Sequence, residues 1–456
     1  MLYDSVLRLD DDGALVGGLA ETWEAESASS YSFVIRDDAT CADGTAITAD
    51  VVAASLAYLA DPETGSGFRS LVFGPGTADV TADGDTVNIT LTEPYSDLER
   101  GLTIAQAGII CPAGLADLDG LAAGTVEGAF SGPYTLADAE PGLSYELALR
   151  ADYDAWPSFA EPLTGTAPSR ITYGLATDGS TTANQLLSGD LDFATVFGDT
   201  VDRFEGDSAF NITTTISAGV YITFNEQEGS VFAEDQPLRQ AVARAIDREA
   251  YNTVLSDGRA PLYASVVSPS YECVNTDESL LEPYDPEAAT PLLEGVTIRI
   301  VQSTAFGDDG AGGEYIQQAL TEAGATVELQ STDNATWAST ISTPGSAWDM
   351  TITGDINAAG VISASLDRVM GPSIADGGRS SGAADNPEGY AALKAGLATV
   401  DETERCAYFQ VAQETMLERD DVVPLSGILG DNITREGVSI RAFGDYYDPA
   451  TVRITD

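Results

Sequence analysis

The stretch Val296-Thr297-Ile298-Arg299-Ile300-Val301 is a short apolar run that is rich in β-branched residues. Such a run predicts a strand that is buried in a sheet. Residues 315–323 then predict a helix, and residues 326–329 predict a second strand. A strand, a helix and a strand joined by short loops are typical of the βαβ unit of an α/β fold.

A similar unit precedes this one in the chain. Residues 170–175 predict a strand, 181–187 a helix and 192–196 the next strand. Residues 220–225 predict a further strand, and Pro237 then stands where a helix can begin. The chain is therefore expected to contain two separate α/β cores.

The first third of the chain is predicted to be rich in β-strands. Residues 30–36 and 87–91 alternate between apolar and polar side chains, and turns with Asp and Gly separate such segments, as at Asp83-Gly84-Asp85. This part is expected to be a β-rich insertion in the first core. We therefore divide the chain into three parts. The α/β core of lobe I is predicted to comprise residues 1–30, 160–225 and 426–456, and the β-rich subdomain of lobe I residues 31–159. Lobe II, also α/β, is predicted to comprise residues 226–425.

The charge balance of the chain is strongly acidic. Its 456 residues include 73 Asp and Glu against 20 Lys and Arg, which gives a formal net charge of −53. Phosphate backbones and anionic membrane surfaces would be repelled, so nucleic-acid binding is not expected. The acidity favours a well-solvated surface over a special adaptation to salt, because net charge reports on solubility and not on fold.

Histidine is absent from the chain. Ser-His-Asp and Cys-His catalytic arrangements and the usual Cys/His zinc sites are therefore excluded. The chain also lacks a P-loop and a nucleophile elbow, so we expect no enzyme activity, no cofactor and no metal. A secreted hydrolase with two carboxylates stays open as a minor alternative, because acidic residues are abundant.

The four cysteines are Cys41, Cys111, Cys273 and Cys406. None has C-x-x-C spacing, and two pairs of distant cysteines suit structural disulfides in an oxidising compartment, with buried free thiols as the alternative. Four cysteines allow three connectivities. We prefer Cys41–Cys111 and Cys273–Cys406, because each pair then falls within one proposed lobe.

Polar and aromatic residues near strand ends are candidates for ligand contacts, because ligands of open α/β sheets sit beyond the carboxyl ends of the strands. As a set from two α/β cores they suit a cleft between lobes. The candidates selected by this rule are Phe197, Tyr221, Asn225, Phe306, Asp355 and Asn357. The glycine-rich loop Gly307–Gly313 could present a helix N-terminus to a carboxylate, but a flexible loop is the simpler interpretation.

Several blocks of the sequence resemble the family 5 extracellular solute-binding proteins, which include the oligopeptide- and dipeptide-binding proteins of ABC importers. The likeness runs in order through nearly the whole chain. The matching blocks are Tyr3–Asp10, Gly18–Glu24, Phe33–Asp37, Ala42–Val52, Ser131–Tyr134, Gly189–Asp192, Phe224–Asn225, Leu238–Ala241, Ala245–Arg248 and Trp348–Gly354.

The resemblance implies a two-lobed α/β clamp of the type II periplasmic-binding-protein kind, which encloses its ligand in a cleft. It also implies an exported monomer, periplasmic or a cell-surface lipoprotein, that works with an ABC transporter permease. Family members carry a signal sequence and a further strand before the block at Tyr3. We therefore expect that this chain has been processed or shortened at that end.

One departure from the family pattern bears on the ligand. Peptide-binding relatives follow the glycine at the position of Gly354 with a tryptophan and an Asp-Tyr-type stretch, whereas here the run is Gly354-Asp355-Ile356-Asn357. Asp355 could still pair with the ammonium group of a short peptide, and Arg379 with its carboxylate. The alternative ligand is an oligosaccharide or another small polar solute that stacks on Phe197, Tyr221 and Trp337.

Overall fold

The computed structural model describes residues 1–175, 178–306, 310–357, 359–443 and 446–455. Its largest sheet has the strand order β10-β15-β11-β14-β12-β13. The strands of this sheet are β10 (Phe193–Val196), β11 (Phe210–Phe224), β12 (Thr297–Ser303), β13 (Thr326–Thr332), β14 (Met350–Asp355) and β15 (Val422–Arg435).

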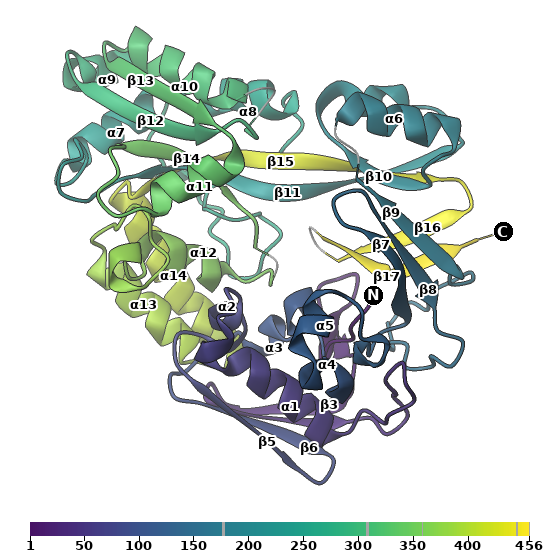
Figure 1. Cartoon of the computed structure of the whole chain (residues 1–456). Helices are drawn as coiled ribbons and strands as arrows, with labels where there is room; N and C mark the ends of the chain where they lie inside the picture. Colours follow the sequence, from purple (N-terminus) through teal and green to yellow (C-terminus); the bar gives the residue numbers. More distant parts are fainter. Residues whose placement is uncertain (176–177, 307–309, 358, 444–445, 456) are drawn as a thin grey trace.

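The long strands β11 and β15 connect the two lobes of the molecule (Figure 1). They pair with each other from Phe210 to Thr223, while β10 adds to β15 in lobe I and β14 adds to β11 in lobe II. Each lobe has its own buried core, as the sequence predicts, but one hydrogen-bonded sheet continues from lobe to lobe. The predicted strand at residues 220–225 is only the end of β11, whose threonine-rich start gives no apolar pattern.

In lobe II, helices pack on both faces of this sheet. Val220 and Ile222 of β11 lie in a core with β12 and α10, whereas Tyr221 between them lies in a second core with α12 and α14. The helices of lobe II are α7 (Gln236–Ala245), α8 (Arg248–Ser256), α9 (Pro286–Leu293), α10 (Ala311–Glu322), α11 (Asn334–Ser342), α12 (Ile362–Met370), α13 (Pro387–Leu397) and α14 (Glu402–Glu418).

The predicted local structure of this lobe is confirmed. The strands at 296–301 and 326–329 and the helix between them correspond to β12, β13 and α10. Pro237 lies in the first turn of α7, where the Asp235 side chain accepts a hydrogen bond from the Leu238 amide at 3.0 Å.

Lobe I surrounds the other end of the long strands. Its core of α6 and β10 buries Leu186, Val196 and Ile433. The remaining elements here are α6 (Gly179–Ser188), β1 (Leu7–Leu9), β2 (Leu15–Gly17), β7 (Tyr134–Glu140), β8 (Ser144–Leu149), β9 (Arg170–Gly174), β16 (Val438–Phe443) and β17 (Tyr446–Ile454).

The β-rich subdomain contains the sheet β3-β4-β6-β5. Here β3 pairs with β4, and β7 and β8 form a sheet with β9, while the boundaries 31–159 stay a prediction. Which strands pair depends on tertiary contacts, and the alternation of apolar and polar residues within one strand does not reveal it. The elements are β3 (Ala20–Ser27), β4 (Ser30–Ile35), β5 (Ala78–Asp83), β6 (Thr86–Leu91), α1 (Ala49–Ala60), α2 (Arg69–Phe73), α3 (Leu98–Gly101), α4 (Pro112–Ala116) and α5 (Leu118–Ala122).

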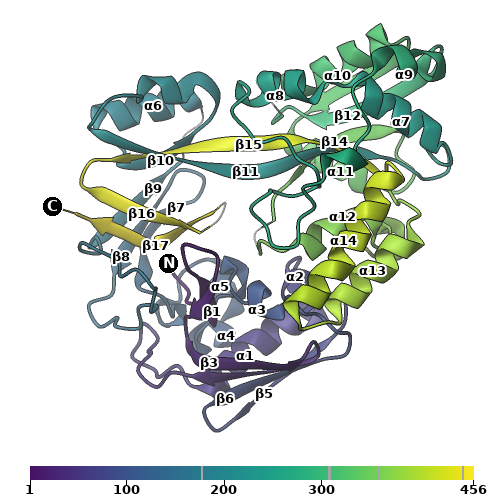
Figure 2. The ribbon, with the colours of Figure 1, turned by 180° about the vertical axis from the view of Figure 1, so that it is seen from behind.

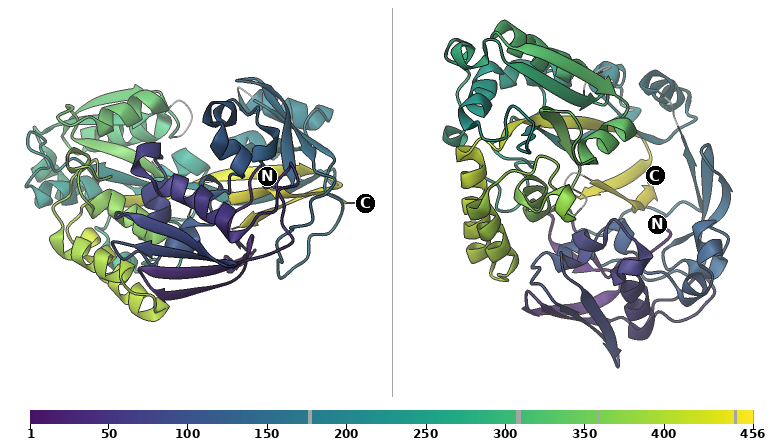
Figure 3. Two further views of the ribbon diagram at one scale, coloured as in Figure 1. Left: turned by 60° about the horizontal axis from the view of Figure 1, so that its bottom comes forward. Right: turned by 60° about the vertical axis from the view of Figure 1, so that its left-hand side comes forward.

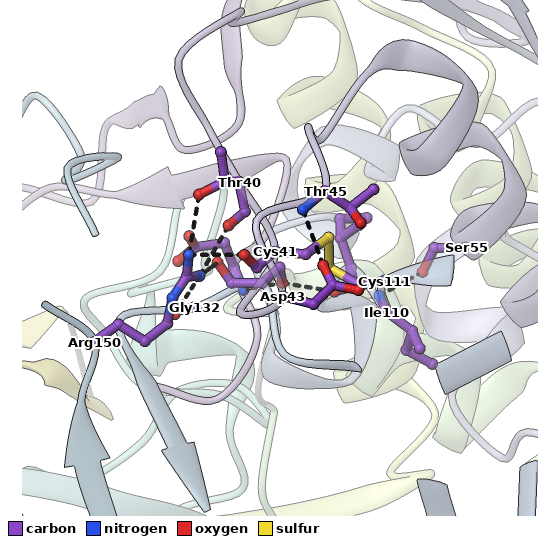
Figure 4. Close-up of a disulfide and its surroundings, with 12 residues drawn as sticks. Thr40, Cys41, Asp43, Thr45, Ser55, Ile110, Cys111, Gly132 and Arg150 are labelled. Carbon is purple, nitrogen blue, oxygen red and sulfur yellow. Dashed lines mark hydrogen bonds between the residues drawn. A yellow bond between two sulfur atoms is a disulfide. The ribbon is translucent and has the colours of Figure 1, made fainter. Parts of the chain in front are cut away.

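Both predicted disulfides, Cys41–Cys111 and Cys273–Cys406, are confirmed. Figure 4 shows Cys41–Cys111 in the β-rich subdomain, where the Arg150 guanidinium donates to the backbone oxygens of Thr40 (2.8 Å), Cys41 (2.9 Å) and Gly132 (3.2 Å). This bridge therefore stabilises the core of its own subdomain.

The two lobes also touch through the β-rich subdomain, which lies beside α13 and α14 in Figures 2 and 3. Arg100 of α3 forms a 2.8 Å ion pair with Glu272, the Ser96 amide donates to the Leu397 carbonyl at 2.9 Å, and Ser363 donates to Asp97. Lobe II is thus held to lobe I by polar contacts as well as by β11 and β15. Among the described residues, no helix is both long and apolar enough to span a bilayer.

Candidate functional site

A small pocket lies where β11 and the end of β14 meet the loop of residues 257–275 and the start of β17. Its volume is about 220 Å³, including space open to solvent. Both lobes contribute, because β17 belongs to lobe I and β14 to lobe II. The pocket is lined by Ile216, Ser217, Ala218, Gly219, Tyr263, Val267, Ser268, Tyr271, Asp355, Asn357 and Tyr446.

A bulge in β11 shapes one wall of the pocket. Ile216 pairs with Leu429 and Ala218 pairs with Ile428, so Ser217 is the extra residue of the bulge. Gly219 follows, and a Cβ atom there would lie only 2.7 Å from the Tyr263 ring. The missing side chain at Gly219 therefore allows this ring to lie directly on the strand.

The loop of residues 257–275 forms the opposite wall and lies beneath β11 and β15 in Figure 2. The Tyr263 amide donates to the Leu425 carbonyl at 3.1 Å, which ties the loop to β15. The buried Gln413 side chain on α14 accepts from the Ser265 hydroxyl at 2.8 Å and the Asn275 amide at 2.7 Å. With the Cys273–Cys406 bridge, these bonds hold a long loop in one conformation.

Asp355 ends β14 and is the acidic group of the pocket. Its side chain is only 2% exposed and forms a 2.9 Å ion pair with Arg368 of α12. The close distance does not give an aligned bond, because neither carboxylate oxygen receives a hydrogen bond of good geometry from the described residues. Buried carboxylates normally accept several hydrogen bonds, so Asp355 has unused acceptor capacity at the pocket wall.

Asn357 and Tyr271 stabilise the segment after β14. The Asn357 amide nitrogen donates to the Val361 carbonyl and to the Ser365 hydroxyl at 3.1 Å, and the Tyr271 hydroxyl donates to the Asn357 carbonyl at 3.2 Å. The side-chain amide of Asn357 is therefore occupied within the protein, although the residue lines the pocket.

Tyr221 lies beside this group in β11 and is fully buried. Burial, and then the negative charge of Asp355, raise the pKa of its phenol well above the usual range. Its hydroxyl finds no hydrogen-bond partner among the described residues. Tyr221 therefore lies within the electrostatic range of Asp355, behind the pocket wall.

Phe197 and Arg379 lie close to this region without lining the pocket. Phe197 and the pocket residue Ser217 both lie against Gly430. A Cβ atom on this glycine would be 2.6 Å from Ser217 Oγ and 3.7 Å from Phe197 Cε1. The Phe197 side chain is 53% exposed. Arg379 is half-buried. Burial raises the pKa of Asp367 above its usual value, and the charge of Arg379 lowers it by a smaller amount.

The other three candidates, Asn225, Phe306 and Trp337, lie outside the pocket lining and remain untested predictions as ligand contacts. Asn225 donates to the Trp348 carbonyl at 2.8 Å, at the opposite end of β14 from Asp355. Phe306 is buried against Gly354 and Trp337, whose indole N–H donates to Thr351 Oγ1 at 2.8 Å.

Strand direction explains the placement of Asn225. The rule for carboxyl ends applies to parallel strands, but β11 runs antiparallel to β14. The carboxyl end of β11 therefore lies at the amino end of β14. Sequence patterns did not reveal this direction.

The sequence-based prediction missed Ser217, Gly219, Tyr263, Ser268 and Tyr446 in the pocket lining, and Arg368 as the partner of Asp355. Two signals could have found some of them. A glycine inside a strand, as in Ser217-Ala218-Gly219, indicates a bulge, and a long loop with aromatic residues, as at 257–275, is often functional.

The glycine-rich loop Gly307–Gly313 lies partly outside the described residues, at 307–309. At the start of α10, the Gln302 side chain donates to the Gly310 carbonyl at 2.8 Å and lies against Gly313. Elsewhere in the described ranges, no group of three or more Cys, Asp or Glu side chains is arranged to hold a metal ion.

Comparisons with known proteins agree with this architecture. The family model of bacterial extracellular solute-binding proteins, family 5 middle part, matches residues 14–376. A substrate-binding protein of Microbacterium hydrocarbonoxydans, solved in complex with 4-hydroxybenzoate hydrazide, is 37% identical with a TM-score of 0.87, and the alignment covers 100% of this chain and 94% of that one.

Curated relatives are more distant. The periplasmic murein peptide-binding protein MppA of Escherichia coli (strain K12) is 25% identical over 58% of this chain and 50% of its own length. The probable peptide ABC transporter periplasmic-binding protein y4tO of Sinorhizobium fredii (strain NBRC 101917 / NGR234) is 25% identical over 73% of this chain and 65% of its own. The chain thus spans between half and two thirds of the length of these relatives.

The two-lobed clamp that the resemblance implied is confirmed by these solved and curated proteins and by the shared sheet of β11 and β15. The family model covers most of the chain, and the alignment with the Microbacterium structure extends over all of it. This chain therefore belongs to the family 5 bacterial extracellular solute-binding proteins.

Proposed function

We propose that this chain captures a small ligand between its lobes and delivers it to the membrane permease of an ABC importer, acting outside the cytoplasm as a monomer. The observation that carries the proposal is the pocket shared by both lobes, with the buried and incompletely hydrogen-bonded Asp355 on its wall. The names of the two curated relatives support an extracytoplasmic location. Two disulfides suit such an oxidising compartment.

Short peptides are the first ligand class of the proposal. MppA is a murein peptide-binding protein, y4tO is a probable peptide ABC transporter periplasmic-binding protein, and the family is one of solute-binding proteins. The pocket is small in this structure, which favours a short ligand over a long one.

A small aromatic ligand is the second class. The pocket wall includes the side chains of Tyr263, Tyr271 and Tyr446. Aromatic walls favour planar ligands through stacked or edge-to-face contacts. The Microbacterium protein, which is similar over the whole chain, was solved with an aromatic hydrazide. An oligosaccharide is less favoured, because Tyr221 is fully buried and Trp337 lies outside the pocket lining.

Calorimetric titration of the purified protein with short peptides and with small aromatic amides tests the proposal. The matched variants are Ser217→Phe, which fills the pocket, and Thr213→Phe, which adds the same ring at an exposed site of the same strand. We expect Ser217→Phe to weaken binding by at least about tenfold and Thr213→Phe to change it by less than about twofold. Binding that survives Ser217→Phe unchanged would place the ligand elsewhere.

A further inference from the structure

We propose that the Asp355 end of the pocket binds a neutral N–H group of the ligand, such as an amide or hydrazide nitrogen, in preference to an ammonium group. This inference rests on the proposed function and narrows its ligand class. It follows from two properties of the Asp355 carboxylate. Its charge is balanced by Arg368, but its oxygens accept no well-aligned hydrogen bond from the described residues.

The charge of Asp355 is already neutralised within the protein. Arg368 Nη1 lies 2.9 Å from Asp355 Oδ1, and the pKa of Arg368 is raised, chiefly by the charge of Asp355. Asp355 is only 2% exposed and Arg368 is 27% exposed, so water screens this pair less than it would an ion pair on the surface. An ammonium group beside Asp355 would be attracted by the carboxylate and repelled by the nearby guanidinium, and would bring an unbalanced positive charge into a buried site.

The hydrogen-bonding capacity of Asp355 is unused. Both oxygens are buried, and neither accepts a well-aligned hydrogen bond from the described residues. A neutral N–H donor would supply the missing bond to an ionised acceptor without adding charge. The desolvation of a neutral group is also less costly than that of an ammonium group.

Two neighbouring polar side chains of the pocket wall are already engaged within the protein. The Asn357 side chain is engaged with Val361 and Ser365, as described above, and the Ser268 hydroxyl is shared with Ser270 at 2.7 Å. The pocket wall continues with the three tyrosines, which suit a planar group. The preferred ligand therefore combines a planar body with a neutral N–H group that faces Asp355.

Calorimetry with matched probes at fixed pH 7 and fixed salt tests this preference. The probes are 4-hydroxybenzamide and 4-hydroxybenzoate hydrazide as neutral donors, 4-hydroxybenzylamine as the ammonium and 4-hydroxybenzoate as the anion. We expect the neutral donors to bind at least about tenfold more tightly than the amine. An amine that binds as tightly as the amide, or more tightly, would overturn the inference.

The same comparison applies if only peptides bind. An N-acetylated dipeptide amide should then bind more tightly than the same dipeptide with a free amino group. The reverse order would overturn the inference and leave the proposed function intact. If neither peptides nor aromatic probes bind, the proposed function fails, and the inference fails with it.

Arg368→Gln tests whether the charge of Arg368 is the cause of the preference for a neutral donor. Removing the guanidinium exposes the charge of Asp355 to the ligand, so the ratio of amine affinity to amide affinity should rise by at least about tenfold. Arg299→Gln, which removes the arginine that pairs with the buried Asp349 just before β14, should leave this ratio unchanged. Because the ratio is measured within one variant, partial unfolding does not alter it. An unchanged ratio in Arg368→Gln would contradict the proposed cause.

Discussion

The two ends of strand β14 each carry a buried aspartate that pairs with an arginine, but the two pairs are built differently. Asp349, just before the strand, accepts from Arg299 Nε at 2.8 Å, Arg299 Nη2 at 2.6 Å and the Arg299 amide at 2.8 Å. Asp355, at the other end, has its ion pair with Arg368 and no aligned bond from the described residues.

The difference in hydrogen bonding separates a structural pair from a pair that is available to a ligand. Burial alone would raise the pKa of Asp349, but the hydrogen bonds and charge of Arg299 outweigh it, and the pKa lies below its usual value. A satisfied carboxylate contributes to stability, whereas an unsatisfied one is costly until a donor arrives. We therefore expect Asp349 to matter for folding and Asp355 for binding.

Asp349→Asn should have the largest effect. The change removes the charge and one strong acceptor, and it leaves the Arg299 guanidinium and the partly buried Arg299 amide poorly paired. We expect a loss of about 2–3 kcal/mol in the free energy of unfolding, measured by urea denaturation. Ligand affinity of the folded variant should stay within about twofold of the wild type. A loss below about 1 kcal/mol would contradict the structural role of this pair.

The pH dependence of stability should reflect the same pair. Because the pKa of Asp349 is lowered in the folded state, its contribution is complete above the ordinary Asp pKa of about 3.9 and is lost as the pH falls through the lower folded value. The stability difference between the wild type and Asp349→Asn should therefore be constant from pH 7 to pH 5 and shrink below about pH 4. A difference that persists at pH 2 would show that the charge is not its source.

Asp355→Asn should show the opposite pattern at the other end of the strand. We expect a change of less than about 1 kcal/mol in stability, because the carboxylate lacks aligned hydrogen bonds and Arg368 is partly exposed. Ligand affinity, measured by calorimetry, should fall by about tenfold. If stability falls as much as in Asp349→Asn, the two ends are equivalent and the comparison is mistaken.

The aromatic candidates give the smallest expected effects. Phe197 covers the glycine beside Ser217 near the pocket, whereas Trp337 donates its indole N–H to Thr351 within the protein. We expect Phe197→Ala to weaken ligand binding by about threefold through a lost aromatic contact, and Trp337→Phe to leave the binding constant unchanged. Both constants can be measured with one fluorescent or calorimetric assay. A larger effect of Trp337→Phe would extend the site toward α11.

Local sequence patterns predicted the regular elements well because their causes are local. The apolar positions Ile298 and Ile300 are buried in β12, and Ile316 and Leu320 are buried on the inner face of α10. Pairing of the four cysteines also followed from the sequence, since each bridge closes within one lobe. Strand pairing was not predicted, because β3 pairs with β4 and β8 pairs with β9 through contacts that no local pattern contains.

By itself, the sequence determined the α/β class, the absence of histidine-based chemistry and the presence of Asp355 at the end of a strand, and it favoured the pairing of cysteines that the structure has. Only the tertiary structure decided which residues share the pocket. The antiparallel direction of β11 moved Asn225 to the far end of β14, and the fold brought Arg368 of α12 to Asp355. Strand direction and charge pairing depend on contacts between distant segments, and the pattern within one segment does not contain them.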